Sequence, residues 1–205
     1  MPRPSVKDKL LDAALEEFLD RGFNGCGVQD ITDAAGVPKG SFYNHFKSKE
    51  ALAVETLQRY MALSSPASAA ASPLARLKAH FTFLAERVAA WEFRRGCLLE
   101  SFATETADAS PLMRSAMAEA FDGWTANVAD LLAQAQSAGE VDPGLDASSC
   151  ARFLVHAWEG AVTGAKVAKS RRPIDDFFAI AFAMLGRGCV SPAAASPTRL
   201  TPGQA

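Results

Sequence analysis

The chain has 205 residues, a formal net charge of −2, and a composition that is 49% hydrophobic and 21% charged. These values are typical of a globular protein with a sizeable core, and they exclude a disordered or fibrous chain. No apolar run approaches the roughly 20 residues of a bilayer span. Nor does the N-terminus carry the apolar segment of a signal peptide. We therefore expect a cytoplasmic protein, with no membrane partner and with free thiols at Cys26, Cys97, Cys150 and Cys189.

Apolar residues recur at helical spacing along the chain, and no segment alternates as a strand does, so the sequence predicts an all-α fold. Gly22, Gly36 and the caps Ser48, Ser110 and Asp146 set most boundaries. The predicted helices cover residues 5–21, 28–35, a short helix from 38, 48–63, 74–91, 97–107, 111–139, 146–170 and 174–185. Arg171, Arg172 and Pro173 are expected to break the last two apart.

Serine and proline are concentrated in residues 64–73 and mark a joint between two regions. Residues 1–60 are predicted to form a DNA-binding head, and residues 61–187 a helical body. Residues 188–205 are rich in Ala, Ser and Pro and are predicted to be a disordered tail.

The head contains the most informative stretch of the sequence, ITDAAGVPKGSFYNHFKSKEAL at residues 31–52. It reads as helix, tight turn and short helix. The apolar side chains Phe42 and Phe46 lie one turn apart, so one face of the short helix points into a core. Small and polar residues then occupy the outward face, where they can approach base edges and phosphates.

The segment AGVPKGSFYNHFKSKEAL resembles the DNA-binding signature of the TetR-type transcriptional repressors. This resemblance implies a helix-turn-helix head, a body that binds a small-molecule effector, and a homodimer on palindromic double-stranded DNA, with no cofactor. Base reading would fall to Lys39, Ser41 and Asn44, and phosphate contacts to Tyr43, His45 and Lys49. The full set of predicted DNA contacts is Gln29, Thr32, Lys39, Gly40, Ser41, Tyr43, Asn44, His45 and Lys49.

One departure from the family pattern lies just before the second helix. The family usually has Thr or Ser there, whereas this chain has Gly25, Cys26 and Gly27. Glycine is an acceptable cap without a hydroxyl, so a side-chain contact to phosphate is predicted to be missing.

The head is not basic in bulk, so DNA binding has to rest on where its charges lie. Arg3, Lys7 and Lys9 lie at the start of the first helix, and Lys39, Lys47 and Lys49 surround the recognition helix. Few phosphate contacts per subunit are expected, and therefore a shallow dependence of affinity on salt.

Small residues gather on one face of residues 146–170. The family resemblance implies that the last two helices of each subunit build a four-helix dimer interface, which small residues suit. The alternative is that they serve packing within one chain. These residues are Ala157, Gly160, Ala161, Gly164 and Ala165.

The resemblance also implies an effector pocket in the body. Aromatic side chains at helical spacing are more often core than pocket, but three tryptophans fall within residues 91–158 and favour a pocket for a small, flat or unsaturated compound. The predicted lining is Trp91, Cys97, Phe102, Trp124, His156, Trp158 and Lys166.

Cys97 is the strongest candidate in the body for a reactive, effector-sensing residue. It lies at a predicted helix N-terminus after Arg94 and Arg95, and both features favour a reactive thiolate. Its surroundings resemble the NemR-like branch of the family, which senses electrophiles through a cysteine, and this resemblance would bring Lys166 near the thiol. The alternative is an inert or ligand-lining cysteine.

Other function classes have little support in the sequence. An enzyme would need a phosphate-binding glycine loop, a metal pair or a nucleophile elbow, and none is present. His80 and His156 are single histidines without a metal-pairing neighbour. An interaction module that has lost DNA binding is the remaining alternative, and no enzymatic activity and no metal are expected.

Overall fold

The computed structural model describes residues 5–64 and 72–186. Most of the predicted joint at 64–73 and the predicted tail at 188–205 lie outside the described residues. Within them the chain forms helices and no strand, so the all-α prediction is confirmed. The elements are α1 (Val6–Arg21), α2 (Val28–Ala34), α3 (Lys39–Tyr43), α4 (Lys49–Leu63), α5 (Pro73–Ala90), α6 (Leu98–Thr106), α7 (Pro111–Ser137), α8 (Ala147–Ala168) and α9 (Arg172–Gly186).

Local chemistry sets most of these boundaries. Ser5 caps α1 through a reciprocal pair of contacts with Asp8. Ser48, Ser110 and Asp146 each accept a hydrogen bond from a backbone N–H in the first turn of the helix that follows.

The break between the last two helices falls earlier than predicted. Lys169 ends α8 in the left-handed conformation, with φ of 49°. Arg172 and Pro173 then belong to the first turn of α9, where a proline displaces no helical hydrogen bond. The prediction that both residues interrupt the helix was therefore wrong.

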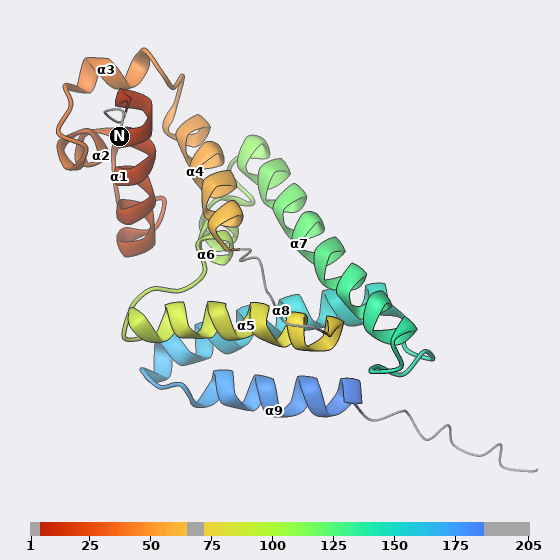
Figure 1. Cartoon of the computed structure of the whole chain (residues 1–205). Helices are drawn as coiled ribbons and strands as arrows, with labels where there is room; N and C mark the ends of the chain where they lie inside the picture. Colours follow the sequence, from red (N-terminus) through yellow and green to blue (C-terminus); the bar gives the residue numbers. More distant parts are fainter. Residues whose placement is uncertain (1–4, 65–71, 187–205) are drawn as a thin grey trace, which may run out of the picture.

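The N-terminal head comprises α1–α3 and the start of α4. Its core is made of fully buried apolar side chains from all four helices, including Phe18, Ile31, Phe42 and Leu52. Figure 1 shows the head at one end of the molecule, with α4 leading from it toward the body.

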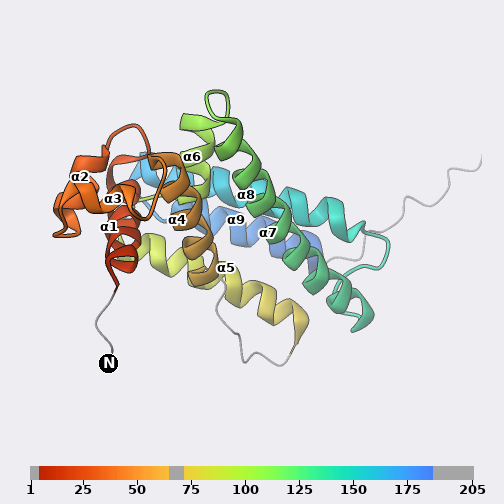
Figure 2. The same ribbon diagram turned by 90° about the horizontal axis from the view of Figure 1, so that it is seen from above.

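The body comprises α5–α9, and the 27-residue helix α7 is its centre. α7 packs against α5, α6 and α8, and also against α4, while α9 packs on α8. Figure 2 shows α4 between the head and the body. Because α4 belongs to both packing units, a change in the body has a rigid route to the head. None of the described helices is long and apolar enough to cross a membrane.

Candidate DNA-binding surface and effector cavity

The recognition helix α3 has the two faces that the sequence predicts. Phe42 and Phe46 are buried, with 0% and 2% exposure, and their rings are 5.7 Å apart. The outward face carries side chains and a glycine that are largely exposed, with Ser41 half-buried, and that form no ion pair with any residue the structure describes. These residues are Lys39, Gly40, Ser41, Tyr43, Asn44 and His45. This face is available for a DNA groove.

Two of the predicted DNA contacts need correction. Thr32 is fully buried, and its hydroxyl donates to the carbonyl of Gln29, so it is not available to DNA. The ammonium of Lys49 donates to the carbonyls of Phe23 and Cys26 at 2.8 and 3.0 Å, and lies 4.1 Å from the centre of the Phe23 ring. Lys49 therefore holds the loop between α1 and α2 in place, and its ammonium is not free to bind a DNA phosphate.

Gln29 remains on the surface beside α3. Its side chain is exposed and its amide donates to Asp33 at 2.7 Å. The cap of α2 is Gly27, whose amide donates to Asp30 at 2.7 Å. No hydroxyl is present at this cap, as the sequence departure implied.

The acidic residues of α1 are paired with cations inside the molecule. Arg59 of α4 contacts Asp12 at 2.6 Å, and Arg95 contacts Glu16 and Asp20 at 2.9 and 2.6 Å. The near-neutral bulk charge of the head therefore understates the positive potential around α3, where Lys39 and Lys47 have no ion pair within the described residues.

The exposed face of α8 and α9 carries large apolar side chains. Phe153, Val167 and Ile180 are 53%, 80% and 68% exposed, and Gly160 has open space around it. Two of the small residues predicted for this face serve the chain itself, because Ala165 is buried and Gly164 packs on Pro173. Packing within the chain thus accounts for these two positions, and the dimer interface stays a prediction for the other three.

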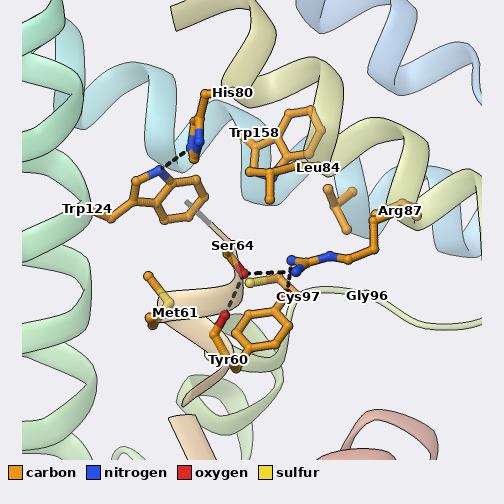
Figure 3. Close-up of a pocket in the computed structure, with 12 residues that line it drawn as sticks. Tyr60, Met61, Ser64, His80, Leu84, Arg87, Gly96, Cys97, Trp124 and Trp158 are labelled. Atoms are coloured by element: carbon orange, nitrogen blue, oxygen red, sulfur yellow. Dashed lines mark hydrogen bonds between the residues drawn. The ribbon is translucent and has the colours of Figure 1, made fainter. Parts of the chain in front are cut away.

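A cavity lies between α4, α5, α6, α7 and α8 (Figure 3). Its lining residues are Tyr60, Met61, Ser64, His80, Leu84, Arg87, Val88, Gly96, Cys97, Trp124, Trp158 and Val162. The remaining space is about 30 Å³, which holds one or two water molecules. An effector larger than a few atoms must therefore displace side chains.

The cavity contains a fixed cation. The guanidinium of Arg87 donates to the hydroxyls of Ser64 and Tyr60 at 2.9 and 2.8 Å (Figure 3). It also lies against the rings of Tyr60 and Trp91. Its Nε has no hydrogen-bond partner among the described residues. Arg87 thus joins α5 to the C-terminal end of α4.

On the opposite wall, Trp124 Nε1 donates to His80 Nε2 at 2.9 Å (Figure 3). That geometry requires an unprotonated Nε2. Burial lowers the pKa of His80 to about 4, and nearby Arg87 adds to the effect. His80 is therefore a neutral wall residue at pH 7.

Cys97 faces the cavity from the N-terminal end of α6, but the predicted activation of its thiol is not what the structure shows. Arg94 pairs with Glu92, and Arg95 pairs with α1. Burial raises the pKa of the Cys97 thiol well above its usual value, and the carboxylate of Glu159 raises it further. The prediction of a thiolate favoured by neighbouring arginines was wrong.

Three of the residues predicted to line the pocket do line this cavity, namely Cys97, Trp124 and Trp158. Phe102 is buried between Phe18 and Phe23, with ring centres 5.1 and 6.0 Å away, so it fastens α6 to the head.

The other three residues predicted to line the pocket lie outside this cavity. Trp91 covers Arg87 and Arg95 from outside, and His156 is exposed beside Phe121. Lys166 lines a second, more polar cavity of about 240 Å³ that shares Cys97 and Gly96 with the first. Cys97 therefore stands between two cavities.

Sequence reasoning missed the polar residues that line the cavity. Tyr60 and Ser64 lie one turn apart at the end of α4, and His80, Leu84 and Arg87 share one face of α5. Polar side chains on the apolar face of a helix were the available signal. Their convergence depends on how α4 packs on the body, which no local pattern encodes.

The segment that carries Cys97 is also fastened to the head at both ends. Arg95 binds α1, and Glu105 at the end of α6 accepts the amides of Phe23 and Asn24 at 3.2 and 2.7 Å. Gly22 lies directly against the Glu105 carboxylate. A displacement of α6 would therefore move the end of α1.

The comparisons with known proteins agree with this geometry. Residues 10–56 match the family described as bacterial regulatory proteins, tetR family, and residues 73–181 match the tetracyclin repressor-like C-terminal domain. The chain belongs to the TetR family, and it is a DNA-binding transcriptional regulator.

Two curated relatives match most of the chain. The HTH-type transcriptional repressor DhaR of Mycobacterium sp. (strain GP1) is 34% identical over 90% of this chain and 94% of its own. The HTH-type transcriptional repressor NemR of Escherichia coli (strain K12) is 31% identical over 85% of this chain and 90% of its own. The crystal structure of E. coli NemR in its reduced form aligns with a TM-score of 0.79 and 28% identity, over 91% of this chain and all of that one. These relatives are regulators, not enzymes.

Proposed function

We propose that this protein is a homodimeric repressor that binds a palindromic DNA operator and leaves it when a small molecule or electrophile occupies the cavity at Cys97. The proposal rests on one observation: a single segment of the chain both lines the cavity and connects the body to the head. Cys97 lines the cavity, and Arg95 and Glu105 on either side of it bind α1 and the turn after it. DhaR and NemR are both repressors, which supports the direction of regulation.

The dimer is supported by the exposed apolar face of α8 and α9. An isologous interface there would place two heads on one side of the dimer, and a two-fold dimer reads a palindrome with half-sites about one helical turn apart or a multiple of it. Lys39, Ser41 and Asn44 would read bases, and Tyr43 and His45 would contact phosphates.

Two modes of effector binding fit the cavity. In the first, Cys97 forms a covalent bond with an electrophile, a mode supported by the likeness to NemR, whose solved structure is that of the reduced form. In the second, a reversible ligand packs on Trp124 and Trp158 and uses Arg87. The half-buried thiol is compatible with both modes.

A gel shift on the DNA upstream of the protein's own gene tests the proposal. The wild type and a Cys97→Ser variant are compared with and without a thiol-reactive quinone. A specific shift that quinone abolishes in the wild type but not in the variant supports the covalent mode. A shift that ignores quinone keeps the repressor and supports the reversible mode, whereas the absence of any specific shift with operator DNA contradicts the proposal.

A further inference from the structure

Glu159 of α8 is a buried carboxylate without a hydrogen bond. Its exposure is 6%, and neither of its oxygens has a partner among the described residues. A buried polar group with no partner costs free energy, because it has lost the water that would otherwise solvate it. Such a group in a native core calls for a role beyond packing.

The charged and titratable groups around Glu159 come from three other helices. Val162, one turn after Glu159 on the same face of α8, lies within 3.9 Å of the position that a Cβ on Gly96 would take, so this face of α8 lies beside the segment that carries Cys97. Glu159 and the Cys97 thiol also act on each other's pKa. Arg87 is nearby, but it is already bonded to Ser64 and Tyr60. The groups that act on Glu159 or on the thiol are Tyr60 from α4, Arg87 from α5, and Cys97 and Glu100 from α6, with Lys166 of α8 acting on Glu100.

We propose that Glu159 accepts the proton of the Cys97 thiol when that thiol adds to an electrophile in the cavity. The inference rests on the proposed electrophile response of Cys97. For an α,β-unsaturated carbonyl compound, sulfur forms a bond to the β carbon as the S–H proton passes to the Glu159 carboxylate. The electron pair of the C=C bond moves into an enolate, and the proton on Glu159 then passes to the α carbon. The net reaction is addition of S–H across the double bond, with no oxidant or reductant.

The environment of the thiol makes such an acceptor necessary. Burial raises the pKa of the Cys97 thiol above its usual value and so favours the protonated form. Burial also raises the pKa of Glu159 to about 7, and an acceptor works best when its pKa is close to the working pH.

Other groups near the thiol are poor acceptors. His80 Nε2 already accepts from Trp124. Lys166 lines the second cavity, on the other side of Cys97. Glu100 is the remaining carboxylate, and it lies on the side of Cys97 that faces Lys166. Glu100→Gln is therefore the matched control for Glu159→Gln.

The rate of Cys97 alkylation by N-ethylmaleimide, measured from pH 5.5 to 9 by mass spectrometry of the Cys97 peptide, tests the inference. We expect the wild-type rate to rise with an inflection near pH 7. Glu159→Gln should react at least about tenfold more slowly at pH 8 and lose the inflection, while Glu100→Gln keeps it. Glu159→Asp keeps a carboxylate at a greater distance, so it should react more slowly but retain an inflection.

A Glu159→Gln protein that reacts as fast as the wild type, or faster, would show that Glu159 only shields the thiol, and would overturn the inference. The same proteins are assayed for release from operator DNA by quinone. If Cys97→Ser blocks release but Glu159→Gln reacts normally, the proposed sensor stands and the role of Glu159 fails. If the wild type gains no adduct at Cys97, the covalent mode and the role of Glu159 both fail, and the reversible mode remains. Should Glu159→Gln not fold, the wild-type pH profile still tests the inference, since a profile without an inflection near pH 7 contradicts it.

Discussion

Arg95 of the α5–α6 loop and Asp20 of α1 form a two-point ion pair, with Nε 2.6 Å from Oδ1 and Nη2 2.8 Å from Oδ2. The pair joins residues 75 positions apart in the sequence and connects the wall of the cavity to the first helix of the head. Arg95 also contacts Glu16, and the contact with Asp20 lowers the pKa of that carboxyl below its ordinary value. Bidentate geometry on a mostly buried arginine makes this pair stronger than an ordinary surface contact.

Replacing Arg95 with Gln should weaken the response to effector more than it weakens DNA binding. The variant loses one connection between α6 and α1 but keeps the recognition helix. We expect the effector concentration for half-release to rise by about 2- to 30-fold, a coupling of roughly 0.5 to 2 kcal/mol. Fluorescence anisotropy on operator DNA measures it. Arg94→Gln is the control, because Arg94 pairs with Glu92 in its own loop. An unchanged release curve for Arg95→Gln would show that this ion pair does not couple the cavity to the DNA-binding head.

Gly22 and Glu105 form the second connection between head and body. Gly22 has φ of +74°, and a methyl group there would collide with the Glu105 carboxylate. Gly22→Ala should therefore lower the free energy of unfolding by about 1 to 2 kcal/mol for the backbone and by more for the collision. Gly36→Ala is the matched control, with φ of +65° and open space around it, so it incurs the backbone strain alone.

Thermal denaturation compares the two glycine variants. Adding Glu105→Ala to Gly22→Ala should cost less than Glu105→Ala costs in the wild type, because the collision disappears. Equal losses for Gly22→Ala and Gly36→Ala would mean that the loop before α2 moves away from α6 without cost.

Lys39 and Lys49 should have opposite phenotypes, although Lys39 begins the recognition helix and Lys49 begins the helix that follows it. Lys39 is exposed, so Lys39→Ala should weaken operator binding by roughly 1 to 3 kcal/mol and relax specificity, with little change in unfolding. Lys49→Met removes the donor to the carbonyls of Phe23 and Cys26 and should lower the free energy of unfolding by about 1 to 3 kcal/mol. Gel shifts on operator and unrelated DNA, together with thermal unfolding, separate the two effects. A loss from Lys39→Ala that is equal on both DNAs would assign Lys39 to phosphate contact.

The exposed apolar face of α8 and α9 predicts how the dimer can be broken. Ile180 is 68% exposed on α9, and a glutamate there would place a charge in the proposed interface. Ile180→Glu should give a monomer in analytical ultracentrifugation and lose operator binding. Leu112→Glu is the control, because Leu112 is 50% exposed on α7, away from this face. Dimers of unchanged stability in Ile180→Glu would place the interface elsewhere.

The head was predictable from sequence because its signals are local. Caps such as Ser48, glycines at helix ends and the pair Phe42 and Phe46 act within one or two turns, and each prediction drawn from them is confirmed. Thr32 and Lys49 failed because a family motif assigns side chains to DNA without reporting what the folded head does with them.

The cavity was only partly predictable, because its walls come from five helices. Trp91 and Trp124 are equivalent in a helical pattern, and only the packing of α5 on α7 sends one outside and the other into the cavity. Glu159 did carry a signal, since it interrupts the buried stripe of Val155, Trp158 and Val162 on α8. A charge at such a position is a candidate functional group whenever no partner for it can be named.

Glu159 also predicts how stability depends on pH. Burial raises its folded pKa to about 7, above the ordinary value of 4.5, so between these values the folded state binds more protons than the unfolded state. Stability from this group is therefore fully present below about pH 4.5 and is lost as pH rises toward 7, by an amount on the order of 3 kcal/mol. Glu159→Gln stays neutral, so its free energy of unfolding should exceed that of the wild type at pH 8 and approach it at pH 5. Urea denaturation at both pH values measures the difference, and a gap that stays constant with pH would mean that Glu159 ionises as freely in the folded protein as in the unfolded chain.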